Sequence, residues 1–149
     1  MDDLTRWLGE QLDEDERIAK AATSGPWWHN PGKQWLGPDA FEKYDLRRGE
    51  EFVGYGGPHP FTGAVASTGP ASNAQGMKDA AFIAEHDPAR VLREVDAKRQ
   101  ALAHFERIWQ HVRQGDEAYI LAEGAVSKQI QIMASAYADR PGYRAEWRP

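Results

Sequence analysis

The side chains of this chain that could do chemistry are histidines, carboxylates and hydroxyls, because it contains no cysteine. Without cysteine the chain has no disulfide, no thiolate zinc site and no thiol nucleophile. None of the histidines belongs to a His-Glu-x-x-His pattern. His104 and His111 are seven residues apart, which on one helix places them about two turns apart, too far to share a metal ion without a third element. The sequence therefore predicts no metal site and no cofactor. The five histidines are His29, His59, His86, His104 and His111.

The other candidates for catalysis each have a simpler structural interpretation. His86 and Asp87 could form a general base and the carboxylate that orients it, but Asp87 is also the best helix cap in the chain. The hydroxyls of Ser67 and Thr68 occur outside any Gly-x-Ser-x-Gly nucleophile turn. The acidic run Asp13–Glu16 is typical of a solvated helix face. We predict no catalytic residue, and the sequence favours a protein that is not an enzyme.

A glycine-rich stretch, Gly54–Ala71 (GYGGPHPFTGAVASTGPA), could be taken for a loop that binds phosphate. It lacks the Lys-Ser/Thr that ends a P-loop and the Gly-x-Gly-x-x-Gly that opens a dinucleotide-binding helix. We interpret it as a loop or hairpin tip.

Aromatic side chains crowd the segment from residue 27 to residue 61, where glycine and proline are also frequent. One interpretation is that the rings fill the core of a small sheet with few aliphatic residues. The other is a pocket in which a planar ligand such as a nucleotide stacks, with arginines for its phosphates. The residues proposed for this ligand-binding pocket are Trp27, Trp28, Trp35, Tyr44, Arg47, Arg48 and Tyr55.

Length and composition indicate one globular domain over residues 1–149. Hydrophobic residues make up 41% of the chain and charged residues 28%, which excludes a disordered composition. The formal charge of −5 disfavours binding to nucleic acid or to an anionic membrane. The first residues are acidic and do not resemble a secretory signal, and no apolar run approaches the roughly 20 residues of a membrane span. We therefore expect a cytoplasmic protein that makes no contact with membranes.

The longest predicted element is a helix over Pro88–Gln114, about 27 residues or 40 Å long. Asp87 is placed to cap its first turn, and Gly115 can take the left-handed conformation that ends a helix. Apolar residues recur along it every three or four positions, with Lys98 as the one interruption. These apolar residues are Val91, Val95, Leu102, Phe105, Trp109 and Val112.

Two interpretations of this apolar stripe are open. The stripe can pack against other elements of its own chain, or its far end can pair with a second copy, because such spacing is also that of a coiled coil. The candidate association surface of the resulting homodimer is formed by Phe105, Trp109 and Val112.

An acidic amphipathic helix is predicted over Asp2–Ala22. The long helix is basic, so antiparallel or crossed packing of the two helices could match charge along their flanks, or each charged face could simply be solvated. The apolar side of the first helix comprises Leu4, Trp7, Leu8, Leu12, Ile18, Ala19 and Ala22.

Shorter elements complete an α+β fold, in which a small antiparallel sheet packs against the helices. Strand candidates are Trp27–His29, Gly63–Ser67, and a hairpin of Lys43–Arg47 with Glu51–Tyr55. A short helix over Asp79–Glu85 is expected to pack inward through the side chains of Ala80, Phe82, Ile83 and Ala84.

After Gly115 the chain is expected to form one or two further helices, with Asp116 as a cap and Gly124 as a possible break. Near the end of the chain, a last helical turn could lay Tyr143 and Trp147 on the core. Alternatively, this tail could dock on a neighbouring subunit.

Three stretches carry a family resemblance: Ser24–Trp27 (SGPW), Ala81–Arg93 (AFIAEHDPARVLR), and Tyr137–Pro149, which opens with YADRP and closes with EWRP. In this order they resemble a family of uncharacterised small proteins of actinobacteria and their phages. More distantly, the first two are similar to accessory early proteins of lambdoid phages. The resemblance covers about half of the residues, and Gln34–Gly76 lies outside it.

The resemblance implies a phage or prophage accessory protein in a bacterial cytoplasm. It supplies no catalytic residues, because the family has no assigned activity and the matching residues are of structural types. The predicted function is therefore non-enzymatic: the protein binds a host macromolecule, with a host protein and a second copy of itself as the expected partners. The alternative is a binding or sequestering protein for a nucleotide-type small molecule, which would use the aromatic segment over residues 27–61.

Overall fold

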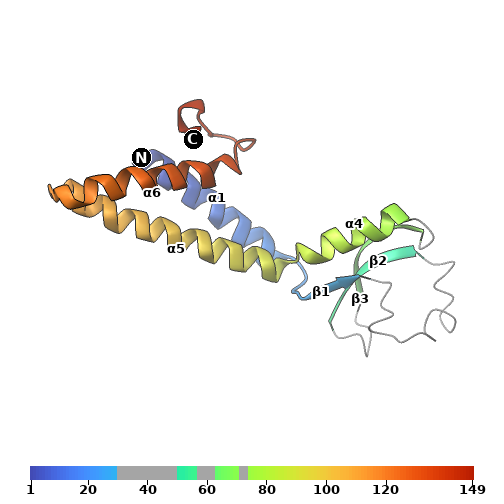
Figure 1. Ribbon diagram of the computed structural model, residues 1–149. Coiled ribbons are helices and arrows are strands. Elements are labelled where there is room, and N and C mark those ends of the chain that lie inside the picture. The colour runs from blue at the N-terminus through green and yellow to red at the C-terminus, as the bar shows by residue number, and fades with distance from the viewer. Residues whose placement is uncertain (30–49, 57–62, 71–73) are drawn as a thin grey trace. The chain divides into compact units, whose positions relative to one another are not determined.

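The structure is a computed structural model that describes residues 1–29, 50–56, 63–70 and 74–149 (Figure 1). Within those residues it contains four α-helices and a three-stranded antiparallel sheet, which confirms the predicted α+β class. The chain divides into two compact units. The helical unit comprises Met1–Arg17 and Arg93–Pro149, and the sheet unit comprises Ile18–Leu92. That 1–149 behaves as a single domain stays a prediction.

Helices α1 (Asp2–Ala21), α5 (Pro88–Arg113) and α6 (Ile120–Ser135) contribute to the helical unit. In Figure 1, α6 follows α5 after a short connection and lies beside it. That connection contains the 3₁₀ turn η1 (Glu117–Tyr119). The core of this unit consists of Leu4, Trp7, Leu8, Leu12, Val95, Leu102, Phe105, Ile108, Ile130, Ala134, Tyr137 and Trp147.

The long helix α5 has nearly the predicted bounds. It begins after Asp87, whose Oδ1 accepts a hydrogen bond of 2.7 Å from the backbone amide of Arg90. It ends at Arg113, and Gly115 has a φ of +84°, as a left-handed helix stop requires. The chain also buries Ile108, which the predicted stripe did not include.

The first helix matches the charge of α5 along their contact. Arg99 of α5 lies 2.6 Å from Asp13 and 2.7 Å from Glu16, so charges of the two helices are matched here, as one of the two alternatives predicted. Ile18, predicted on the apolar side, is instead 52% exposed. From Ile18 onward the helix belongs to the sheet unit, where Ala19 is the buried residue of the last turn.

The sheet has the order β1-β2-β3, with β1 at Trp27–His29, β2 at Glu50–Tyr55 and β3 at Gly63–Pro70. All three contain predicted strands, and both pairings are antiparallel. Trp27 pairs with Tyr55 in the register of β1 and β2. The predicted hairpin partner of β2, over residues 43–47, lies outside the described residues.

Helix α4 (Ala74–Glu85) packs on the sheet and starts five residues before the predicted helix. Val53 of β2, Ala80 and Ala84 form the buried cluster between them. Gly76 permits this close packing, because a Cβ there would lie 2.6 Å from the backbone oxygen of Thr68. The predicted inward packing of Phe82 is wrong, since this side chain is 65% exposed.

The end of the chain packs on its own helical unit. After α6, which runs through Gly124 without a break, the chain reaches the 3₁₀ turn η2 (Ala145–Trp147). The rings of Tyr143 and Trp147 both contact the ring of Trp7 in α1, as the first of the two alternatives predicted.

None of the helices in the described ranges combines the length and apolar character that crossing a bilayer requires.

Candidate functional site

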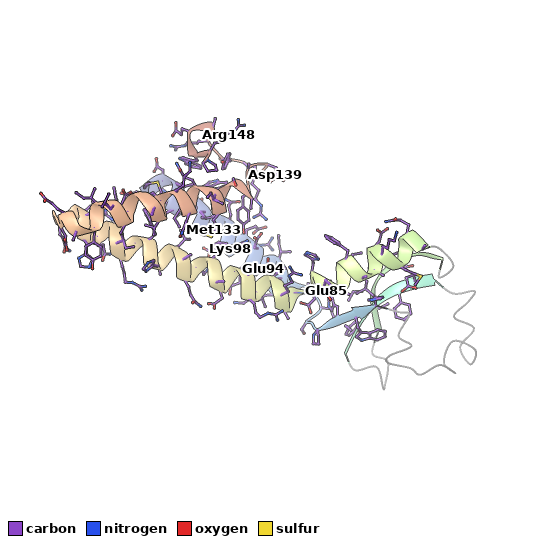
Figure 2. All side chains as sticks on the ribbon, in the orientation of Figure 1. Glu85, Glu94, Lys98, Met133, Asp139 and Arg148 are labelled. Atoms are coloured by element: carbon purple, nitrogen blue, oxygen red, sulfur yellow. The ribbon has the colours of Figure 1, made fainter. Side chains whose placement is uncertain are left out.

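Polar side chains enter the core of the helical unit where the apolar stripes of two helices are interrupted. Lys98 interrupts the stripe of α5, and Asp15 lies between the buried residues Leu12 and Ala19 of α1. The two side chains meet at the hydroxyl of Tyr137, which follows α6. Lys98 Nζ donates a hydrogen bond of 2.8 Å to Tyr137 Oη, which donates one of 2.8 Å to Asp15 Oδ2. Figure 2 labels Lys98 one turn after Glu94 on α5, with Met133 on the neighbouring helix α6.

Arg140 closes this cluster from the other side of the tyrosine ring. Its guanidinium donates to Asp15 Oδ1, and to the backbone oxygen of Gln11 at 3.3 Å. Its Cζ lies 4.7 Å from the centre of the Tyr137 ring, and Lys98 Nζ lies 4.9 Å from the same centre. The two cations and one carboxylate surround a neutral phenol.

The electrostatics of the cluster argue for a structural role. Burial, and then the hydrogen bond to Asp15, raise the pKa of the Tyr137 hydroxyl above its ordinary value. A phenol with a raised pKa stays protonated at neutral pH, so it serves as a hydrogen-bond donor and is a poor general base. We interpret the cluster of Asp15, Lys98, Tyr137 and Arg140 as structural, because its hydrogen bonds fix how α1, α5 and the residues after α6 pack together. We call these four residues the polar lock.

In the sheet unit, one carboxylate joins two of the three motif stretches. Asp87 is 7% exposed, and besides capping α5 its Oδ2 accepts a hydrogen bond of 3.2 Å from the backbone amide of Trp27. Gly25 lies against this carboxylate, where a Cβ would overlap it. The Gly25-Pro26 peptide bond is cis. The packing of the Asp87 carboxylate against the first stretch explains why position 87 is an aspartate and position 25 a glycine.

The third motif stretch holds the chain end to α1. Trp7 Nε1 donates a hydrogen bond of 3.0 Å to the backbone oxygen of Pro141, and the Trp7 ring centre lies 5.6 Å from that of Tyr143 and 5.3 Å from that of Trp147. Gly142, with a φ of +86°, lets the backbone turn closely against the Trp7 ring. The motif residues of all three stretches therefore have structural contacts.

Three of the seven residues proposed for the ligand-binding pocket lie in the described part of the chain. Trp28 is 6% exposed, packs against Gly54, and donates from Nε1 to the backbone oxygen of Gly56 at 3.0 Å. Trp27 and Tyr55 are paired across the strands, so they share the opposite face of the sheet. The rings are thus divided between two faces, and ligand binding stays a prediction. Outside the described residues are Trp35, Tyr44, Arg47 and Arg48.

Glu51 of β2 is a titratable residue that the sequence did not single out. It is 1% exposed, and burial raises the pKa of its carboxyl to about 7. Its Oε1 and the Nδ1 of His29 have no hydrogen-bond partner within the part of the chain that the structure describes. The burial of Glu51 could have been predicted from strand alternation, because residues two positions apart in a strand share a face and Val53 is buried.

A family model gives the chain its place among known proteins. The model of the family of unknown function DUF6221 matches residues 1–149. The chain belongs to this family. Comparison with curated proteins and comparison with solved structures both gave no match.

The association surface predicted for this DUF6221 protein lies at the far end of α5. Phe105 is 1% exposed and packs inside its own chain, with its ring 6.2 Å from that of Trp109. Trp109 and Val112 are partly exposed. Association through this end stays a prediction. Because Phe105 is buried, the contact with a second copy would have to be made by Trp109 and Val112.

The largest exposed apolar side chains of the DUF6221 helical unit lie on α6. Leu121 is 89% exposed, and Ile120 and Ile132 are each more than half exposed. Other residues of α6 form, together with α5, a groove of about 120 Å³. The groove is lined by Ala101, His104, Val126, Gln129, Ile130 and Met133.

The described ranges of this DUF6221 chain contain no group of side chains that could bind a metal ion. No three His, Asp or Glu side chains gather there closely enough to hold an ion.

Proposed function

We propose that this chain is a non-enzymatic accessory protein of phage type that binds a host protein in the cytoplasm and associates with itself. The observation that supports binding is the exposed apolar face of α6. Ile120, Leu121 and Ile132 expose more than half of their side-chain surface on one short helix. Leu121 and Ile132 lie about three turns apart on the same side of α6, and exposed apolar residues on one surface commonly mark protein interaction sites.

The shape of this face suits a partner helix. The groove between α5 and α6 combines the small Ala101 with the larger Val126 and Met133. An amphipathic helix laid along the exposed side of α6 would bury its own apolar stripe together with Leu121 and Ile132, and the groove could take one of its side chains. Burying a leucine or isoleucine side chain contributes about 1.5–3 kcal/mol, so two or three of them would stabilise a complex substantially.

A non-catalytic role is supported by the use that the chain makes of its polar residues. The partly buried polar cluster around Tyr137 keeps its phenol protonated and pairs the charge of Asp15 with that of Arg140. Asp87 is engaged with two backbone amides. The phage-type role rests on the family resemblance of the three motif stretches, and its host is proposed to be an actinobacterium.

The experiment is affinity capture from an actinobacterial lysate with the full chain as bait. We expect the wild type to retain a defined host protein and the Leu121→Glu/Ile132→Glu variant to retain at least ten-fold less, because two charges would then be buried in the complex. Ala103→Glu is the control, since it adds a charge at an exposed position of α5. Equal capture by wild type and the double variant would overturn the assignment of the α6 face.

A further inference from the structure

The first residue of α1 occupies a groove at the far end of α5. Trp109 Nε1 donates a hydrogen bond of 3.0 Å to Asp2 Oδ1, and Arg113 Nη1 lies 3.8 Å from Asp2 Oδ2. The Arg113 guanidinium also lies over the Trp109 ring, with Cζ 5.6 Å from its centre. An indole N–H and a guanidinium thus converge on one carboxylate, while the ring orients the guanidinium.

The groove around this carboxylate is larger than the side chain that fills part of it. Its volume is about 280 Å³, and it is partly open to solvent. Its lining residues are Asp2, Thr5, Arg6, Phe105, Glu106, Trp109, Gln110 and Arg113. All of them belong to the helical unit.

The contact that Asp2 makes is easy to displace. The Asp2 side chain is 68% exposed and that of Arg113 is 55% exposed, and ion pairs at such exposure contribute about 0–1 kcal/mol. Asp3, next in the chain, has different partners, Arg6 and Arg144. Release of Asp2 would therefore free the two donors without breaking the other ion pairs of the first turn.

We propose that Trp109 and Arg113 form a carboxylate-binding site for an acidic side chain of a partner protein, and that Asp2 occupies this site in the free chain. The proposal rests on the proposed function, because it names a second contact with the bound protein. The contact with Asp2 shows that Trp109 and Arg113 can bind a carboxylate together, Trp109 by a hydrogen bond and Arg113 by an ion pair. Glu106 lines the same groove, and its charge disfavours a doubly charged phosphate more than a singly charged carboxylate.

The test measures binding of a fluorescein-labelled octaglutamate peptide to the full chain by anisotropy, with an octaglutamine peptide as the uncharged probe. We expect octaglutamate to bind more tightly, and Asp2→Ala to tighten its binding up to about five-fold by removing the internal competitor. Arg113→Gln should weaken binding at least several-fold, and added salt should weaken it in all variants.

The matched control is Glu10→Ala, which removes an exposed carboxylate of the same helix that does not line the groove and should not tighten binding beyond the effect of one lost negative charge. Circular dichroism verifies that each variant is folded. Equal binding of the two peptides, equal effects of Asp2→Ala and Glu10→Ala, or unchanged binding by Arg113→Gln would each overturn the proposal. These outcomes are separate from the proposed function, since capture through the α6 face is measured with Leu121 and Ile132 variants.

Discussion

The carboxylate of Asp87 has two structural roles, of which the sequence predicts only one. Its position before Pro88 identifies it as a helix cap, and the structure confirms the bond to the Arg90 amide. Its second bond, to the backbone amide of Trp27, joins residues that are 60 positions apart. That distance leaves no local pattern, so the bond could be found only from the folded chain.

Glu51 is a residue whose chemistry depends wholly on burial. Its carboxyl is 1% exposed, with a folded pKa of about 7 against an ordinary value of 4.5. Between pH 4.5 and 7 the folded protein holds a proton that the unfolded chain has released. The free energy of unfolding therefore falls as pH rises through this window, by on the order of 1–3 kcal/mol.

We predict that Glu51→Gln removes this pH dependence, because the amide stays neutral. Urea denaturation of wild type and variant should give similar free energies of unfolding near pH 4. Above pH 7 the variant should be more stable by on the order of 1–3 kcal/mol. A constant difference between the two proteins from pH 4 to pH 8 would show that Glu51 titrates normally.

In helices α1 and α5, the positions where a polar residue interrupts the apolar stripe show how the two helices are held together. Lys98 and Asp15 each break a stripe, and both breaks meet at the hydroxyl of Tyr137. Once two helices are known to pack together, a polar residue that interrupts each apolar stripe indicates that the two polar side chains meet in the interface. The sequence showed the interruption at Lys98, but its partner is 39 residues away.

We predict that Tyr137→Phe destabilises the protein by about 1–3 kcal/mol, because it leaves a half-buried ammonium and a carboxylate oxygen without their partner. Denaturant unfolding measures the loss. Tyr143→Phe is the matched control, since the Tyr143 hydroxyl is buried without a partner in the described chain and its removal should cost little or stabilise.

The coupling within this lock is tested by a double-mutant cycle. Lys98→Met and Tyr137→Phe should together cost less than the sum of the single losses, because both remove the same hydrogen bond. Additive losses, or equal losses for Tyr137→Phe and Tyr143→Phe, would contradict the interpretation of the cluster as a lock.

For the molecule as a whole, self-association is the prediction that matters most for function. Light scattering should give a molar mass above the 16.7 kDa of one chain, rising with concentration to twice that value. Val112→Asp should return the mass to that of one chain, because it places a charge in the predicted seam. Ala103→Asp serves as the control on the exposed side of the same helix. A single-chain mass at every concentration would refute the homodimer.

The sequence by itself determined most of the helices and strands in the part of the chain that the structure describes. Capping residues, the three- and four-residue recurrence of apolar positions and strand alternation act within a few neighbours, so they predicted α1, α5, the three strands and the α+β class. The same local rules misplaced Phe82, whose position in α4 faces solvent, because helical spacing does not say which side the sheet covers.

Only the tertiary structure decided which polar groups meet and which are buried. The contacts of Asp15, Asp87 and Glu51 depend on the packing of segments far apart in the chain. Desolvation is likewise the sum of many distant neighbours, so no short pattern predicts the raised pKa of Glu51. For the same reason the exposed face of α6 and the groove around Asp2 became visible only in the fold, since a surface is defined by what the rest of the chain leaves uncovered.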